Sequence, residues 1–465
     1  MPIDQAAYEK YRNLPASPVR TLIDASVLLT PKADAESEAG KKQVFAKIRM
    51  NDSNRCPLLT EGRLCRIQAE LGEGLLSHTC ATYPRIVHAA GGAEEKSLTL
   101  SCPEAARLVL LTPDLLAAGN LDRAVGQGFI PGAQAAESTR ALAPAACSSP
   151  IPSQNRHFPS ASSAPDNDED SLPPDFWPIR KTVLALVRNR IYPLWQRLFL
   201  LDLLCRRLDS IAKGELKRSV PDFLRDFEVT VATGALRTAM DTLPLDPAAQ
   251  LDVVLRLAGL LLHRSNIRPR FVDCVQAFTA GIGNGPGATL ESLTAQYSVA
   301  HDRFYEPFFR RQPHIMENYL INTIIRCQFP FGHVGMPANA EPSNAPPSMA
   351  HEFALLAAQF ALMKGLLIGV AGFHGEAFSS VHVVHTVQAA SKHFEHHPGF
   401  LKMAHELLVE SRMDGARGLA ILLRNAGSEI ASISPGLPLT TVLAHASDRE
   451  AKTASAEKSP QVPQG

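Results

Sequence analysis

Hydrophobic positions in the second half of the chain recur every three or four residues, the spacing that places them on one face of a helix. The longest run is IRKTVLALVRNRIYPLWQRLFLLDLLCRRLDSIAKGEL, residues 179–216, in which Pro193 marks a kink or a join between two helices. Further helices are predicted at 248–264, 289–305, 314–329, 353–373, 377–394 and 398–413. The pattern predicts a helical bundle from 176 to 432.

The first 132 residues show shorter and more mixed patterns. AYEKYRNL (7–14) and SPVRTLIDASVLL (17–29) have the spacing of amphipathic helices, and Ser17 is placed to cap the second one. Two stretches alternate as short strands do, KQVFAKIRM (42–50) and KSLTLSC (96–102). We therefore predict a mostly α fold, in which a helical body follows a small N-terminal module with a few short strands.

Two segments have the composition of disordered chain. Residues 133–175 are rich in proline, serine and alanine and end in an acidic run, and residues 433–465 are polar. Such segments bury too little apolar surface to offset the entropy lost on ordering. We predict an N-terminal module at 1–132, a linker at 133–175, a helical domain at 176–432 and a tail at 433–465.

The charge balance argues against two classes of partner. Lysine plus arginine and aspartate plus glutamate both number 46, so no overall field attracts nucleic acid or an acidic membrane. The apolar segment 353–373 is long enough to span a bilayer, but Gln359 and Lys364 within it favour a buried helix. The start of the chain lacks the pattern of a signal peptide and cysteines are sparse, so we expect a cytoplasmic protein with reduced thiols.

Four of the eight cysteines are concentrated in the N-terminal module. Cys56, Cys65, Cys80 and Cys102 are spaced C-x8-C-x14-C-x21-C, and three of them have a proline at or near them. Four thiolates suffice for a tetrahedral zinc site or an iron-sulfur cluster. The spacing lacks the C-x2-C pairs of closed zinc fingers, so four buried, small hydrophobic side chains are the alternative interpretation.

Other polar residues are weaker candidates for catalysis or binding. Glu104 and Arg107 share a helical face after Cys102, where they either contact a cofactor or substrate or form a surface ion pair. Glu317, Asn318 and Asn322 form a polar strip on a predicted helix, with either a catalytic or a buried structural role. The glycine-rich segment GIGNGPGATL (281–290) follows no convincing strand, so it is a weak candidate for a nucleotide-binding loop. Six histidines lie close together in sequence, and we interpret them as surface and packing residues: His374, His382, His385, His393, His396 and His397.

Longer sequence motifs resemble those of a known family. The run CPLLTEGRLCRIQAELGEGLLSHTCATYPRIVHAAGGAEEKSLTLSCPEAARLVLL, starting at residue 56, resembles the core of the flagellin lysine-N-methylases. Members of that family show CP-L-x-G-x-C-R-I-Q-x-x-L-G, then T-C-x-x-YPR, then S-L-x-LSCPEAARL. PHIMENYLINTIIRCQFPF and FALLAAQFALMKGLLIGVAG in the helical half also resemble that family.

The resemblance implies an enzyme that transfers methyl groups from S-adenosylmethionine to lysines of flagellin. It also implies a cysteine-rich N-terminal part linked to an iron-sulfur cluster, with zinc as the alternative. The implied metal ligands are Cys56, Cys65, Cys80 and Cys102, and the implied cofactor-binding residues are Tyr83, Arg85 and Arg107. The resemblance does not identify catalytic residues. The candidates for catalysis are therefore those that the residue pattern suggests: Glu104, Glu317, Asn318 and Asn322.

One feature departs from the family. Its members usually carry another cysteine cluster, ending in a CC pair, upstream of a segment that resembles MPIDQAAYEKYRNLP, which here is residues 1–15. We expect either a gene start further upstream or an incomplete metal centre. The alternative functions are therefore a non-catalytic metal-binding or partner-binding protein derived from the family, and a structural zinc module serving a helical adaptor.

Overall fold

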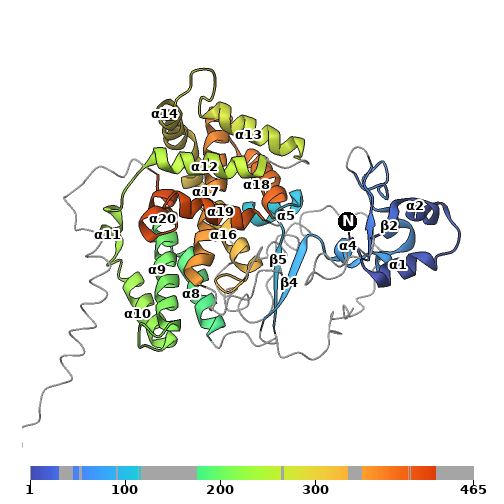
Figure 1. The fold of residues 1–465 in the computed structure, drawn as a ribbon, viewed down its shortest axis with the longest axis horizontal. Coiled ribbons are helices and arrows are strands. Elements are labelled where there is room, and N and C mark those ends of the chain that lie inside the picture. The colour runs from blue at the N-terminus through green and yellow to red at the C-terminus, as the bar shows by residue number, and fades with distance from the viewer. Residues whose placement is uncertain are drawn as a thin grey trace, which may run out of the picture. The chain divides into compact units, whose positions relative to one another are not determined.

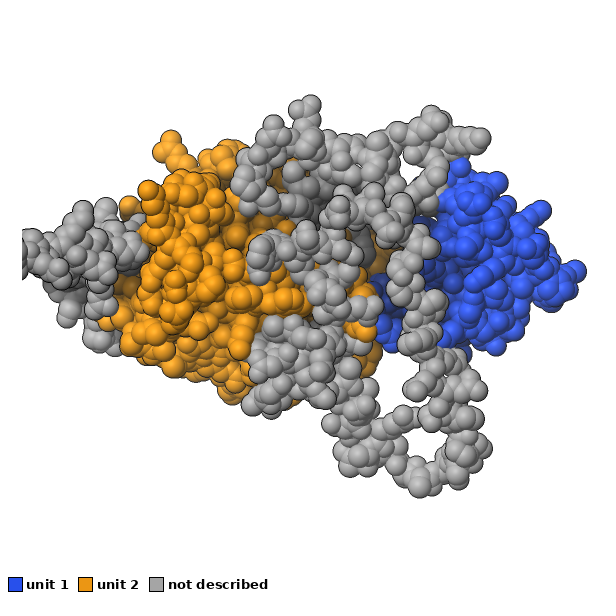
Figure 2. Space-filling view, turned by 90° about the horizontal axis from the view of Figure 1, so that it is seen from below, with its two compact units in different colours: residues 1–86, 335–346 blue, residues 87–334, 347–465 orange. Residues whose placement is uncertain are grey.

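The computed structural model describes residues 2–30, 45–51, 55–90, 93–113, 115–116, 175–262, 267–332, 348–395, 397 and 399–425. Figure 2 shows two compact units, unit 1 with residues 1–86 and 335–346, and unit 2 with residues 87–334 and 347–465. The predicted tail lies outside the described residues, and so does the predicted linker except for Asp175. Each unit has its own hydrophobic core.

Unit 1 is a small sheet covered by short helices. Its elements are β1 (Pro2–Ile3), α1 (Gln5–Arg12), α2 (Pro18–Ser26), β2 (Val27–Leu29), β3 (Ala46–Ile48), the π-helical turn η1 (Ile67–Leu71), the 3-10 turn η2 (Glu73–Leu75) and α4 (His78–Thr82). The strand order is β1-β3-β2 with antiparallel pairing, Pro2 opposite Lys47 and Val27 opposite Ile48. Because Ile3, Ala46 and Ile48 are buried, this sheet holds the core of the unit together.

Two strands join the units in sequence. β4 (Arg85–Ala90), in which the boundary between the units falls, pairs with β5 (Ala93–Leu98), and α5 (Pro103–Leu111) follows. β5 and α5 belong to unit 2. The compact helical unit therefore begins well before residue 176, because residues 95–112 are hydrogen-bonded to its helices.

The rest of unit 2 consists of helices. They are α8 (Phe176–Arg188), α9 (Leu194–Ala212), α10 (Val220–Ala232), α11 (Arg237–Asp241), α12 (Pro247–Leu262), α13 (Pro269–Gly281), α14 (Leu290–Ala300), η3 (His301–Tyr305), α15 (Glu306–Arg311), α16 (His314–Arg326), α17 (Met349–His374), η4 (Gly375–Ala377), α18 (Ser380–Phe394), α19 (Phe400–Glu410) and α20 (Ala416–Leu423). The predicted fold class, mostly α with a few short strands, is confirmed.

The helix α17 forms the centre of unit 2. Figure 1 shows it among α9, α12, α13, α19 and α20, all of which pack against it. Asp209 of α9 anchors its start, because its carboxylate accepts hydrogen bonds from the backbone N–H groups of Met349 (2.7 Å) and Ala350 (3.0 Å). Those N–H groups have no partner within the helix, so the carboxylate both satisfies them and complements the helix dipole.

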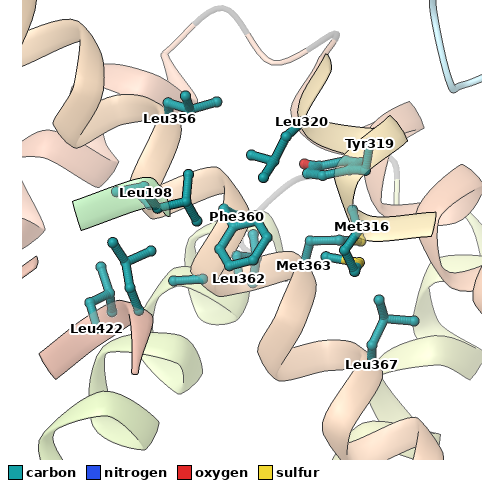
Figure 3. Packing of buried hydrophobic residues seen from close by; sticks show 14 of the residues in the cluster. Leu198, Met316, Tyr319, Leu320, Leu356, Phe360, Leu362, Met363, Leu367 and Leu422 are labelled. Atoms are coloured by element: carbon teal, nitrogen blue, oxygen red, sulfur yellow. The ribbon is translucent and has the colours of Figure 1, made fainter. Parts of the chain in front are cut away.

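The core of unit 2 is filled from both sides of α17. Figure 3 shows Phe360 and Met363 of α17 among Leu198 of α9, Met316 of α16 and Leu422 of α20. All five side chains are at most 2% exposed. α17 is the one helix in the described part of the chain that is long and apolar enough to cross a membrane, and its most apolar window lies entirely inside the protein.

Several local predictions are confirmed. Ser17 caps α2 by accepting a hydrogen bond from the Arg20 N–H, and Pro18 occupies the first turn. Pro193 separates α8 from α9, as expected for a residue that cannot continue a helix. The predicted helix 17–29 is shorter than expected, since its last residues form β2 and pair with β3.

Candidate functional site

Three of the four candidate metal ligands lie in unit 1. Burial raises the pKa of the Cys56 thiol, and the nearby Cys80 and Cys65 raise it further. The same two cysteines act on Tyr11, whose pKa is raised first by burial. Cys56 and Cys65 also pack against the hydrophobic core of unit 1, which includes Tyr11.

The fourth cysteine belongs to unit 2. Cys102 is the N-cap residue of α5 and packs against the unit 2 core. Burial lowers the pKa of the Lys392 amine, as do Arg268 and Arg270, and Cys102 partly opposes them. Within the described ranges, no group of three or more His, Cys, Asp or Glu side chains is placed to hold a metal ion.

The three residues predicted to contact a cofactor are exposed, Tyr83 at the end of α4, Arg85 on β4 and Arg107 on α5. Tyr83 is 41% exposed and joins Pro84 through a cis peptide bond. Arg85 begins β4 and is exposed. Arg107 donates two hydrogen bonds to Glu104, of 2.9 and 2.6 Å, and this pair lowers the pKa of the Glu104 carboxyl. The ion pair that we weighed for Glu104 is thus present.

Glu317 is held between two arginines. It is 4% exposed, and its carboxylate accepts hydrogen bonds from Arg197 (2.9 Å) and Arg190 (3.0 and 3.1 Å). Arg197 also donates to the backbone oxygens of Val187 and Tyr192, where α8 ends. The carboxylate therefore ties α16 to the turn between α8 and α9.

The two asparagines of the polar strip hold the segment that contains β5 and α5. Asn318 Nδ2 donates to the backbone oxygens of Val109 (2.9 Å) and Thr112 (2.8 Å). Asn322 accepts from the N–H of Leu98 (3.2 Å) and donates to its C=O (2.8 Å). Both amides satisfy backbone groups that burial would otherwise leave without partners.

The histidine-rich segment is dispersed over the end of α17 and along α18. The rings of His374 and His382 stack with centroids 3.7 Å apart, and His382 Nδ1 accepts a hydrogen bond from the Ser379 N–H. His393 is buried and accepts from the Arg268 N–H, 125 residues away in sequence. His396 lies outside the described residues. These contacts are of the packing and capping type that we expected.

The glycine-rich stretch 281–290 forms the turn between α13 and α14. Gly283 and Gly287 have φ of 77° and 81°, the left-handed region that favours glycine. Thr289 and Ser292 form a capping box at the start of α14, so the orphan N–H groups there are satisfied by the chain itself.

Sequence patterns missed a buried polar centre between β5, α8, α16 and α18. Arg180, fully buried, donates to Glu95 (3.1 Å) and to the backbone oxygen of Ile324 (2.9 Å). Arg326 lies 3.7 Å from Glu395, measured between Nε and Oε1. The sequence signal that could have revealed this centre is that Arg180 and Arg326 each lie within an apolar run. Helical periodicity alone assigns such arginines to the surface.

Two more buried titratable groups lie on α17. Burial raises the pKa of Glu352 to about 8 and lowers that of Lys364 to about 7. The ammonium group of Lys364 donates to the backbone oxygen of Leu423 (2.6 Å), at the end of α20. The Glu352 side chain lines a small pocket.

We call this hollow the α17 pocket. Its described lining residues are Cys327, Phe329, Glu352, Leu355, Leu356, Gln359 and Leu401. Four of the seven lie on one face of α17, at the spacing i, i+3, i+4 and i+7. The wall is therefore mostly apolar, with one carboxyl, one thiol and one amide.

Comparison with known proteins defines the class. Residues 180–422, more than half of the chain, match the model of the FliB lysine N-methylase C-terminal domain. The matched region contains most of the helical unit and the whole α17 pocket. The chain belongs to the FliB lysine N-methylase family.

Individual relatives match over a shorter segment. The chain is 32% identical to the flagellar biosynthetic protein FliU of Salmonella muenchen over 118 residues, 25% of this chain and 65% of that protein. It is 32% identical to lysine-N-methylases of Salmonella typhimurium strain LT2 and Salmonella choleraesuis strain SC-B67 over 116 residues, 25% of this chain and 27% of each relative. The aligned segments thus span less than two thirds of these relatives. No solved structure matches the chain.

Proposed function

We propose that this protein is a lysine N-methyltransferase that acts on flagellin. The observation that carries the proposal is the match of residues 180–422 to a lysine N-methylase domain, together with the compact helical unit that those residues form. The names of the relatives, lysine-N-methylase and flagellar biosynthetic protein, support a flagellar substrate. We propose further that the reaction takes place in the cytoplasm.

Methylation of lysine sets a chemical requirement on the site where it takes place. The amine must be neutral to attack a methyl group, whereas a lysine in water has a pKa near 10.4 and is protonated at neutral pH. Apolar surroundings lower that pKa, and a nearby base can accept the proton.

S-adenosylmethionine is the methyl donor in this proposal, and it supplies an electrophilic methyl group when bound. The described part of the chain has two small sheets, one of three short antiparallel strands and one of two strands. Neither resembles the larger parallel sheet of nucleotide-binding folds. We therefore assign no described residue to the donor, and Tyr83, Arg85 and Arg107 stay predictions.

The metal centre also stays a prediction. Cys56, Cys65 and Cys80 belong to the same unit, but no described group of three such side chains has the arrangement of a metal site. The residues as placed here do not fit a cluster or a zinc ion, and we route no step of the reaction through one.

The test is co-expression of the chain with its cognate flagellin, followed by mass spectrometry of the flagellin. We expect lysines whose mass is raised by one or more methyl groups. A flagellin that remains unmodified while it still binds the purified chain would instead support the non-catalytic binding protein that we gave as the alternative.

A further inference from the structure

Three basic side chains of unit 2 come from the junction of α13 and α18. Arg268 is the N-cap residue of α13, Arg270 lies in the first turn of that helix, and Lys392 lies in the last turn of α18. Figure 1 shows α18 between α13 and α5, and both helices pack against it. We call Arg268, Arg270 and Lys392 the basic cluster.

Hydrogen bonds of neighbouring residues fix where Lys392 lies. The N–H of Arg268 donates to Nε2 of His393, the residue after Lys392, at 3.3 Å. One turn before Lys392 on the same face of α18, Gln388 Nε2 donates to the backbone oxygen of Ser101 at 2.8 Å. Lys392 therefore lies between the start of α13 and the start of α5.

The basic cluster has no carboxylate partner among the described residues. None of its three side chains forms an ion pair or a hydrogen bond with another residue in that part of the chain. Burial lowers the pKa of the Lys392 amine and the two arginines lower it further, so like charges repel one another here. Other arginines of the same unit are paired, for example Arg197 with Glu317 and Arg206 with Asp202.

The acidic groups on the same three helices do not neutralise the cluster. At the end of α18, Glu395 accepts a hydrogen bond from Thr99. On α5, Glu104 accepts a hydrogen bond from Arg107 at 2.6 Å. Asp273 is exposed on α13 and forms no ion pair with a described residue. The cluster therefore keeps a positive charge, which a bound anion would neutralise.

The starts of two helices add to this positive charge. α5 and α13 each have a proline in the first turn, and neither of their N-cap side chains accepts a hydrogen bond from that turn. The first N–H groups of a helix and its dipole favour a negative charge. This contribution has the same sign as that of the basic cluster, whose side chains supply the main attraction.

A phosphate group matches three cations better than a carboxylate does. A phosphate monoester carries about −1.5 to −2 charges at pH 7 and has three strong acceptor oxygens. The guanidinium fork of arginine binds such oxygens in pairs, and lysine adds a compact point charge. Arg268 and Arg270 are exposed and Lys392 is half-buried, so a phosphate can reach the cluster from solvent.

We propose that the basic cluster binds a phosphate group, either inorganic phosphate or the phosphate of a small ester such as a nucleotide. The bound phosphate joins the start of α13 to the end of α18 and neutralises the three cations. This site is separate from the proposed methylation, because none of the three residues is assigned to that reaction.

A binding experiment tests the site directly. Isothermal titration calorimetry of the purified full chain, at constant ionic strength in chloride, uses inorganic phosphate and adenosine monophosphate as probes. We expect saturable binding of one phosphate group per chain, and weaker binding of acetate, which carries a single charge. Lys392→Gln and Arg270→Gln should each weaken phosphate binding about tenfold, because each removes a charged partner of the anion.

Two matched controls remove the same charges elsewhere in unit 2. Lys402 lies on α19 near Glu406, and Arg310 lies on α15 beside Glu306. Both side chains are exposed and lie outside the basic cluster. Lys402→Gln and Arg310→Gln should therefore bind phosphate like the unaltered chain.

Thermal unfolding provides a second readout, with an opposite sign for a merely structural lysine. Without phosphate, Lys392→Gln should raise the midpoint of unfolding, because it relieves the repulsion among like charges. Added phosphate should raise the midpoint of the unaltered chain more than that of Lys392→Gln, since only a folded chain with an intact site binds the anion. A lowered midpoint of Lys392→Gln without phosphate would contradict the repulsion on which the assignment depends.

The remaining outcomes decide the site and its ligand. Absence of saturable binding of either phosphate probe up to about 10 mM would overturn the assignment. Equal weakening in the control variants would also overturn it, because the attraction would then belong to the whole surface. Tighter binding of adenosine monophosphate than of inorganic phosphate would support a nucleotide as the source, and equal binding would support free phosphate.

Discussion

Two neighbouring helices of unit 2, α16 and α17, bury polar groups in contrasting ways. On α16, Glu317 is held by two arginines, and Asn318 and Asn322 bind backbone groups of the β5–α5 segment. On α17, the pKa values of Glu352 and Lys364 are shifted mainly by burial. The α16 groups hold elements together through these bonds, whereas Glu352 lines a small hollow.

The difference lies in what holds each carboxyl group. The Glu317 carboxylate is fixed by two arginine partners, so it stabilises the fold. A carboxyl in an apolar pocket titrates near neutrality. α16 thus positions the β5–α5 segment, whereas the start of α17 carries a carboxyl group that titrates near neutrality.

The largest expected effect comes from breaking the α16 ion pair. Glu317→Ala should lower the free energy of unfolding by about 3–5 kcal/mol, because it leaves the buried Arg197 guanidinium without its carboxylate. Urea denaturation monitored by circular dichroism measures the loss. Activity per folded molecule should be retained, since the carboxylate is a structural tie.

A double variant separates that structural role from a catalytic one. Glu317→Leu with Arg197→Met removes both buried charges and should recover most of the stability. If the recovered protein fails to methylate flagellin at a rate near that of the unaltered chain, Glu317 takes part in catalysis after all, as its place among our candidate residues allowed.

A second prediction concerns the tightly packed part of α17, beyond the pocket. A Cβ atom at Gly369 would lie 2.6 Å from the Phe278 backbone oxygen of α13, too close for contact. Gly369→Ala should therefore destabilise unit 2 by about 1–3 kcal/mol, measured as a lowered midpoint of thermal unfolding.

Gly259 on α12 is the matched control, because a Cβ atom there meets nothing within 4 Å. Gly259→Ala should raise the stability by up to about 1 kcal/mol through the better helix propensity of alanine. Equal destabilisation by both variants would contradict the close packing of α17 against α13.

The two titratable groups of α17 should give opposite dependences of stability on pH. The folded protein keeps a proton on Glu352 that the unfolded chain loses above its ordinary pKa of 4.5, so stability falls as the pH rises toward about 8. Lys364 in the folded protein loses a proton that the unfolded chain keeps up to 10.5, so stability rises as the pH increases from about 7. Each slope is at most about 1.4 kcal/mol per pH unit.

Single variants assign the two slopes. Glu352→Gln should flatten the fall between pH 5 and 8 without altering the rise at higher pH, and Lys364→Met should do the reverse. Denaturation midpoints across the pH range provide the measurement. A fall that persists in Glu352→Gln would show that other groups cause it.

The sequence was enough to predict most of the long helices of unit 2 and the join at Pro193, because apolar periodicity and proline are local signals. It missed α10, α13 and α20. Sequence patterns did not predict that residues 87–116 belong to the helical unit. That placement depends on hydrogen bonds such as Asn322 to Leu98, between residues 224 positions apart, which leave no local pattern.

The candidate site was predicted less completely than the fold. Helical spacing identified Asn318 and Asn322 as one polar strip, yet it could not tell a catalytic strip from one that binds backbone groups. Glu352 was overlooked because a glutamate in the first turn of a helix is usually an exposed residue that complements the dipole. Glu352 lines one hollow with Leu401 of α19 and Cys327, the residue that follows α16, and neither is near it in sequence.

The smallest effect is expected at the surface pair of α5. Glu104 and Arg107 are 62% and 53% exposed, and solvent screens their attraction, so Glu104→Ala should change the free energy of unfolding by less than about 0.5 kcal/mol. The same variant should methylate flagellin at the rate of the unaltered chain if the pair is only a surface contact, as its exposure indicates. Arg107→Ala is the companion variant, because Arg107 is also our predicted cofactor contact. A weaker affinity for S-adenosylmethionine in Arg107→Ala alone, measured by calorimetry, would assign the arginine to the methyl donor.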